Sequence, residues 1–320
     1  MKAIMYHYVR PFNPEYPNFK NLHIDDFKKQ LDHFESKYGF IKKEEFIKCV
    51  ETGIPQKGVV LTFDDGLHCH YDYVFKELKK RGLWGIFYIP TQPYTEEKIL
   101  DVHRTHLLLG KHSSKIIFSF LDNILDDSLF DQSKLEEFKE FTYKTQENDK
   151  FTLLVKRILN YFVAYEHRSK LIDELMSKFI PNEKDLLKNY YLTDAQILEM
   201  HKEGMVIGPH TVNHPVMSRL SYEEQVFQIH NSFDYLQKIV KKFHQKTFCY
   251  PYGGFHSFND KTEEILLNSN CLYSFNVDQR DIEVSDLQKR PQALPRYDCN
   301  QFRYGQVRQL SPITKDCDKK

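Results

Sequence analysis

At 320 residues, the chain is long enough for one large α/β domain or two smaller ones. Lys and Arg together number 45, and so do Asp and Glu, so no net field would recruit nucleic acid or an anionic membrane. No stretch approaches the roughly 20 apolar residues of a transmembrane helix, and the start shows no signal-peptide pattern. Six cysteines lie scattered without CxxC spacing, which predicts reduced thiols in a cytoplasmic protein.

Hydrophobic patterns alternate between strands and helices over the first 94 residues. Strands are predicted at 2–9, 59–63 and 84–89, and helices around 27–34, 44–50 and 71–81. From residue 95 to residue 190 the strand pattern disappears and apolar residues recur at helical spacing, as at Leu171, Leu175 and Phe179. This stretch is predicted to be a helical insertion.

The alternation resumes after residue 190. Capping boxes begin at Thr193 and Ser221, each opening a helix. Strands are predicted at 205–208, 247–250 and 271–277, a helix at 259–267, and a last element at 293–298. We therefore predict an α/β fold with a discontinuous barrel (1–94 and 191–310), a helical insertion (95–190) and a solvated tail (311–320).

Two adjacent carboxylates, Asp64 and Asp65, end the buried strand at 59–63. Ionised side by side they repel each other, and a metal ion relieves that repulsion. In a regular strand they would point to opposite faces, so both reach one site only if the pleat breaks, for which Gly66 supplies the freedom.

Two histidines, His210 and His214, follow the strand at 205–208. Four residues apart, they can bind one ion from a helix face or from a tight loop, and Pro209 and Pro215 favour the loop. Two histidines and one carboxylate suit zinc or a similar divalent ion. The second nitrogen of each histidine needs an orienting partner, which the sequence does not identify.

Each of these patterns has a plain alternative when taken alone. Asp-Asp before Gly is usually a turn, and a single pair of histidines is usually a surface or core feature. Asp64, Asp65, His210 and Tyr252 all fall just past predicted strand ends, where parallel strands place functional groups. Their joint placement favours one common site.

Three segments resemble the first three motifs of the polysaccharide deacetylases, the NodB-homology group of carbohydrate esterase family 4. They are Thr62–Gly66 (Thr-Phe-Asp-Asp-Gly), His210–His214 (His-Thr-Val-Asn-His) and, in degenerate form, Tyr250–Gly253 (Tyr-Pro-Tyr-Gly). The resemblance covers about 2–91 and 192–298 and implies a distorted (β/α) barrel that removes an acetyl group from an N-acetylated sugar with a divalent metal.

The resemblance also implies residue roles. Asp64 is the base, while Asp65, His210 and His214 bind the metal, which is expected to be Zn2+. The backbone amide of Tyr252 faces the oxyanion, where a fixed donor lowers the barrier to the tetrahedral intermediate.

The chain departs from the family pattern at two places. The family's arginine before the Pro-Tyr pair orients the base; Phe248–Tyr250 stand there instead, and Arg296 could replace it from another strand. The family's late Leu-x-His motif is missing, since the last histidine is His256. In circularly permuted members the acid histidine lies on the first strand, which Ile4–His7 resembles. His7 is therefore the candidate acid, with a buried structural histidine as the alternative.

Other charged residues near these motifs have weaker claims. His68 and His70 are rival ligands at a helix start, interpreted as cleft-lining or exposed. Arg104, at the opening of the insertion, could bind a phosphate or carboxylate of the substrate; a helix-start charge cluster explains it equally well. Arg296 is grouped with Arg104 as a substrate-side residue.

The sequence thus favours a cytoplasmic divalent-metal hydrolase that deacetylates an amino sugar or a glycan precursor, plausibly for surface polysaccharide. Two alternatives remain open. The same site could cleave an O-acetyl ester or a small amide, because the tetrahedral chemistry is shared. The altered third motif and the missing late histidine would also suit a catalytically weak carbohydrate-binding protein.

Overall fold

The computed structural model describes residues 1–132, 135–143 and 148–310, which divide into two compact units. The first unit contains Met1–Arg10, Ile24–Leu100 and Asn182–Gln306. Among the described residues, the second contains Pro11–His23, Asp101–Pro181 and residues 307–310. The predicted tail at 311–320, with Cys317, lies outside the described residues.

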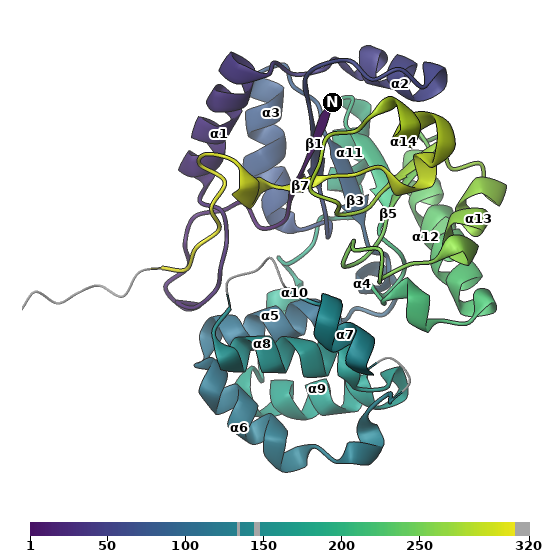
Figure 1. Cartoon of the computed structure of the whole chain (residues 1–320). Helices are drawn as coiled ribbons and strands as arrows, with labels where there is room; N and C mark the ends of the chain where they lie inside the picture. Colours follow the sequence, from purple (N-terminus) through teal and green to yellow (C-terminus); the bar gives the residue numbers. More distant parts are fainter. Residues whose placement is uncertain (133–134, 144–147, 311–320) are drawn as a thin grey trace, which may run out of the picture. The chain divides into compact units, whose positions relative to one another are not determined.

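Parallel strands form the centre of the first unit (Figure 1). They are β1 (Lys2–Tyr6), β2 (Val59–Phe63), β3 (Ile86–Ile89), β4 (Val206–Pro209), β5 (Thr247–Cys249), β6 (Tyr273–Phe275) and β7 (Tyr297–Asp298). Five of them pair in the order β4-β3-β2-β1-β7, and β5 pairs with β6. Every pairing is parallel, which requires a crossover between consecutive strands.

The two ladders follow one another as a distorted barrel. Leu294, three residues before β7, pairs in parallel with Phe275 of β6 and so connects the second ladder to the first. On the other side β5 approaches β4 so closely that a Cβ on Gly208 would lie 2.7 Å from the Thr247 carbonyl oxygen. One hydrophobic cluster contains residues of six strands, including Ala3, Val60, Ile86, Val206, Cys249 and Phe275. The predicted α/β barrel is confirmed.

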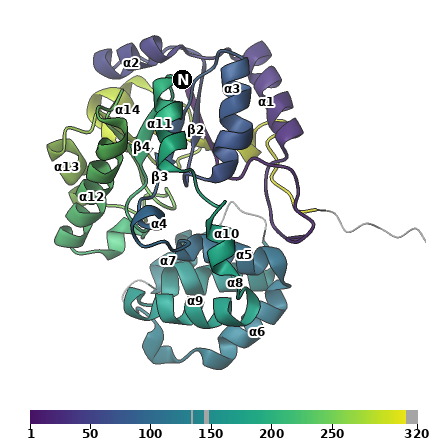
Figure 2. The ribbon, with the colours of Figure 1, turned by 180° about the vertical axis from the view of Figure 1, so that it is seen from behind.

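The first unit also contains helices, most of which lie around the strands (Figures 1 and 2). They are α1 (Ile24–Lys37), α2 (Lys43–Thr52), α3 (Lys76–Lys80), α4 (Gln92–Thr95), α10 (Glu183–Leu187), α11 (Asp194–Lys202), α12 (Tyr222–Val240), α13 (Asp260–Asn268) and α14 (Val284–Lys289). Both predicted capping boxes form: Thr193 caps α11 and Ser221 caps α12, each accepting a hydrogen bond from the third helical backbone amide.

Several predicted boundaries are wrong, and the first strand shows why. It was expected to reach residue 9 but ends at Tyr6, which pairs with Phe63; beyond that point β2 ends as well, so the first strand loses its ladder partner. The helix expected at 71–81 begins instead as a π-helix, His70–Phe75, followed by α3. Helix α14 was not predicted.

The second unit is helical. Its helices are α5 (Asp101–Lys111), α6 (Ser114–Ile124), α7 (Leu135–Phe141), α8 (Lys150–Arg157), a π-helix (Ile158–Phe162) and α9 (Tyr165–Phe179). It begins later and ends earlier than the predicted insertion, and it takes in residues 11–23. That segment packs on α5, where a Cβ on Gly110 would lie 2.5 Å from Phe19. None of the helices in the described ranges is long and apolar enough to cross a lipid bilayer.

Candidate functional site

Asp64 and Asp65 lie where the chain turns away from β2. All five residues of β2 are buried, and the pleat breaks immediately after it: Asp65 has φ 82° and Gly66 has φ 59°. A left-handed φ is uncommon for a non-glycine residue and clusters at functional sites. The turn leaves both carboxylates buried, each residue 2% exposed, and lets them serve one site.

His210 and His214 lie on a loop after β4, as the flanking prolines favoured. Thr211 and His214 have φ 68° and 58°, and the His214 amide donates to Thr211 Oγ1 at 2.9 Å. Gln228 of α12 holds the loop from outside, because its Oε1 accepts hydrogen bonds from the amides of Val212 and Asn213 at 3.0 and 3.2 Å. The loop is therefore fixed by the protein itself.

Asp65 and the two histidines form a donor set that could hold a metal ion. Asp65 Oδ1 lies 3.7 Å from His210 Nε2 and 3.5 Å from His214 Nε2. Nδ1 of His210 is 2.8 Å from the Cys249 carbonyl oxygen, which orients the ring and turns Nε2 toward Asp65. Burial lowers the pKa of His210, which favours the neutral ring that can offer a lone pair. One carboxylate and two imidazoles fit zinc or a similar divalent ion.

Arg296 binds Asp64 through both carboxylate oxygens. Nη1 donates to Oδ1 and Nη2 to Oδ2, each at 2.8 Å, and the guanidinium is wholly buried. Burial by itself would raise the pKa of Asp64, but the charge of Arg296 outweighs it and the pKa is lowered. Arg296 also donates to Thr62 Oγ1, the Asn276 carbonyl and Cys249 Sγ. This geometry matches the orienting role considered for Arg296, and its burial does not support contact with substrate.

The remaining predicted residues are placed as follows. His7 comes directly after β1, with its side chain 39% exposed and Nε2 4.0 Å from Asp65 Oδ2. The Tyr252 ring lies across that of His214, with centroids 4.9 Å apart, and its φ is 63°. Arg104 belongs to the helical unit, where it is buried and paired with Asp101 at 3.1 Å and Asp173 at 2.7 Å. These two carboxylates account for its charge; Arg104 itself is buried, whereas Asp101 is half-buried and Asp173 is exposed.

The rival ligand His70 was expected to line the cleft or to be exposed, and the structure buries it completely. Its ring packs against the stacked rings of Phe63 and Phe87, and Nε2 is 2.8 Å from the His7 carbonyl oxygen. Burial lowers its pKa to about 4. His70 thus supports the backbone of His7, and His68 pairs with Asp72 at 3.1 Å.

Sequence reasoning missed two residues of this site. Cys249 orients His210 through its backbone carbonyl, and Gln228 lies more than ten residues from the loop that it holds. Neither contact leaves a signal in the sequence. The five described cysteines are free thiols, and all five are buried, which the sequence did not predict.

The barrel carries buried carboxylates and histidines at its strand ends, an arrangement similar to that of the polysaccharide deacetylases. Residues 169–270 match the polysaccharide deacetylase family model, a range that contains His210, His214 and the Tyr250–Gly253 motif. This match, together with the fold, confirms the resemblance of the chain to the polysaccharide deacetylase family. No curated protein matched the chain.

Solved structures share the fold. The deacetylase PplD of Streptococcus pyogenes, determined with acetate, is 18% identical, with a TM-score of 0.56 over 93% of this chain and 91% of that one. IcaB from Ammonifex degensii is 17% identical, with a TM-score of 0.51 and coverage of 92% and 90%. A de-N-acetylase from Aggregatibacter actinomycetemcomitans is 15% identical, also with a TM-score of 0.51, covering 92% and 93%.

Proposed function

We propose that the chain removes the acetyl group from an N-acetylated sugar or glycan precursor in a divalent-metal-dependent hydrolysis. The observation that supports this proposal most is that the two adjacent aspartates have different partners. Asp65 lies beside the two histidines, and Asp64 is bound by Arg296. One carboxylate is thus arranged for a cation and the other for proton transfer.

Asp65, His210 and His214 would hold the ion, for which this donor set makes Zn2+ our choice. When bound, such an ion polarises the acyl carbonyl as a Lewis acid. Asp64, kept ionised by Arg296, takes a proton from the attacking water. The backbone amide of Tyr252 donates to the oxyanion of the tetrahedral intermediate.

His7 completes the reaction on the leaving-group side. Its partly exposed ring stands beside Asp65, and His70 holds its backbone. Protonated His7 would give its proton to the departing amine as the carbon–nitrogen bond breaks, leaving acetate and a free amino sugar. Arg104 stays a weaker candidate for an anionic group of the substrate because it is already paired.

The names of the neighbours agree with this reaction, since one is a de-N-acetylase and another was determined with acetate. The zero net charge gives no basis for a nucleic-acid partner. We place the reaction in the cytoplasm, on a precursor rather than a finished polymer.

The test uses purified chain stripped of metal, reloaded with Zn2+ and incubated with matched N-acetyl and O-acetyl sugars. We expect mass spectrometry to show loss of one acetyl group from an N-acetyl sugar, with none lost to the Asp64→Asn variant. Release from O-acetyl sugars alone would point to the esterase alternative. Glycan binding that persists without metal and without turnover would support a binding protein and overturn the proposal.

A further inference from the structure

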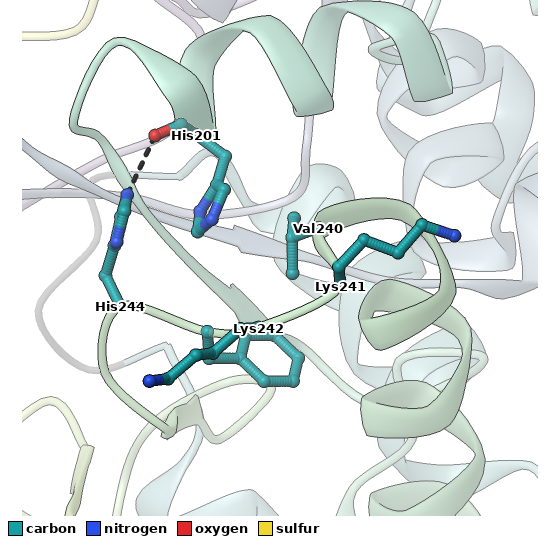
Figure 3. A pocket seen from close by; sticks show the side chains of 6 residues that line it. His201, Val240, Lys241, Lys242 and His244 are labelled. Atoms are coloured by element: carbon teal, nitrogen blue, oxygen red, sulfur yellow. Dashed lines mark hydrogen bonds between the residues drawn. The ribbon is translucent and has the colours of Figure 1, made fainter.

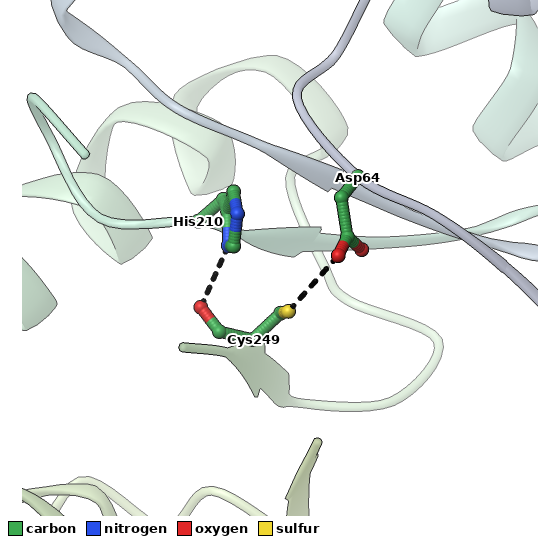
Figure 4. A group of neighbouring side chains, drawn as sticks. All are labelled: Asp64, His210 and Cys249. Atoms are coloured by element: carbon green, nitrogen blue, oxygen red, sulfur yellow. Dashed lines mark hydrogen bonds between the residues drawn. The ribbon is translucent and has the colours of Figure 1, made fainter. Parts of the chain in front are cut away.

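Two overlapping donor sets occur among the described residues. One is Asp65, His210 and His214; the other is Asp64, His210 and Cys249, and in each set the donor atoms lie within 4.8 Å of one another. Figure 4 shows the second set, with Cys249 between the Asp64 carboxylate and the His210 ring. All of these residues are buried.

The sets exclude each other because they share one nitrogen. Nδ1 of His210 is engaged with the Cys249 carbonyl oxygen at 2.8 Å, which leaves Nε2 as the nitrogen available to a metal. One lone pair binds one ion. A cation held by Asp64 and Cys249 would therefore take His210 from Asp65 and His214, and it would also remove the base.

The second set contains one ligand type that zinc prefers and that the first set lacks. It contains a sulfur ligand, and soft thiolates select zinc and related ions, whereas the first set has only nitrogen and oxygen. Some feature of the chain must therefore direct the ion to Asp65 if Asp64 is to act as a base.

Arg296 occupies the position that such an ion would need. Its Nη2 lies 2.8 Å from Asp64 Oδ2 and 3.0 Å from Cys249 Sγ, and Nη1 lies 2.8 Å from Asp64 Oδ1. Nε is anchored on the Asn276 carbonyl oxygen at 3.1 Å, and the guanidinium stacks near Tyr88 and Phe275. A fixed positive charge on two of the three donors repels a second cation.

We propose that Arg296 decides which donor set holds the metal ion: it caps Asp64 and Cys249, confining the ion to Asp65, His210 and His214. Arg296 is thus a positioning residue for the metal as well as for the base. The inference rests on the metal site of the proposed function. It also explains how a cysteine can lie next to a zinc-type site without ligating the ion.

Cobalt(II) spectroscopy of the full chain tests the inference, because a thiolate ligand gives a near-ultraviolet charge-transfer band that nitrogen and oxygen ligands lack. We expect wild-type and Cys249→Ser chains to bind one Co2+ with identical spectra and no such band. Arg296→Met, which removes the charge, should gain the band, and the double variant Arg296→Met/Cys249→Ser should lose it. Arg296→Lys, which keeps a cation there, is the matched control and should resemble wild type.

Circular dichroism establishes that each variant is folded, and Arg296→Gln serves as a second charge-removing variant. A folded, cobalt-loaded Arg296→Met or Arg296→Gln chain without the band would overturn the inference. So would a thiolate band in the wild-type chain that Cys249→Ser abolishes, an outcome that requires no Arg296 variant. If the wild-type chain bound no Co2+, the metal site of the proposed function would itself be wrong.

Discussion

Two pairs of histidines lie near opposite ends of strands β4 and β5, and their neighbours differ in charge and orientation. One pair, His210 and His214, follows the carboxyl end of β4 and faces the carboxylate of Asp65. Just before the amino ends, His201 and His244 stack with ring centroids 3.9 Å apart and an interplanar angle of 19°.

The second pair lines a surface pocket with Val240, Lys241, Lys242 and Phe243 (Figure 3). None of these six lining residues is acidic, and Nε2 of His244 lies 2.8 Å from the His201 carbonyl oxygen. Parallel stacked rings among lysines do not converge on a cation. A pair of histidines is arranged to bind a cation where a carboxylate and an orienting acceptor accompany it, and parallel barrels place such groups at the carboxyl ends of their strands.

Replacing one histidine of each pair with alanine should give the largest difference in metal binding and activity between two variants. We expect His214→Ala to weaken metal binding by more than about 100-fold, since even an orienting partner is worth 10–100-fold, and to abolish deacetylation. His244→Ala, the matched change at the other end, should retain metal and activity. Metal analysis after dialysis, with an acetate-release assay, measures both. Equal loss in the two variants would contradict the distinction between the two ends.

The next prediction tests whether Asp64 and Asp65 have different roles. Asp64→Asn keeps the shape of the side chain but removes the base, so we expect turnover to fall about 10^3–10^4-fold with the metal retained. Asp72→Asn, on a residue that pairs with His68 and Lys76, is the control and should be unaffected. If Asp64→Asn instead lost the metal, Asp64 would be a ligand and the assigned division would be wrong.

His7 should give a smaller loss. We expect His7→Gln to reduce turnover about 10^2–10^3-fold by removing the general acid, with the metal content unchanged. His68→Gln serves as the control because His68 is engaged with Asp72. Unchanged turnover of His7→Gln would assign protonation of the amine to another group.

The features of the fold and site that could be predicted from the sequence are those that depend on residues close together in the chain. The strand at Val59–Phe63, the capping boxes and the Asp64–Asp65 turn are written in short stretches of sequence, and the structure has them as predicted. The spacing of His210 and His214 with flanking prolines likewise indicated a loop.

What failed depended on distant contacts. Strand β1 ends at Tyr6 because its partner strand β2 ends at Phe63, which pairs with Tyr6. Phe63 lies 57 residues further along the chain. The orienting of His210 uses a backbone carbonyl, which any residue at position 249 would supply. The burial of His70 follows from its packing against Phe63 and Phe87, and residues 11–23 contact the helical unit at Gly110. Such contacts arise from tertiary packing, which the spacing of hydrophobic residues along the sequence does not predict.

The smallest expected effect belongs to the amino-end pair and concerns stability rather than catalysis. Burial, then the charges of His244 and Lys43, lower the pKa of His201 from 6.5 to about 4, against an opposing backbone hydrogen bond at Lys242. Between about pH 6.5 and 4 the unfolded chain therefore binds the proton more readily than the folded chain, so stability falls as the pH decreases through this window and is fully present above it. With allowance for solvent around the pocket, His201 contributes on the order of 1 kcal/mol to the change in the free energy of unfolding across this window.

Urea unfolding at several pH values measures this effect. His201→Gln should flatten this part of the pH profile, whereas His230→Gln, on a histidine bonded to Ser269, should keep the wild-type slope. A His201→Gln profile as steep as the wild type would mean that His201 is not a source of the acid sensitivity.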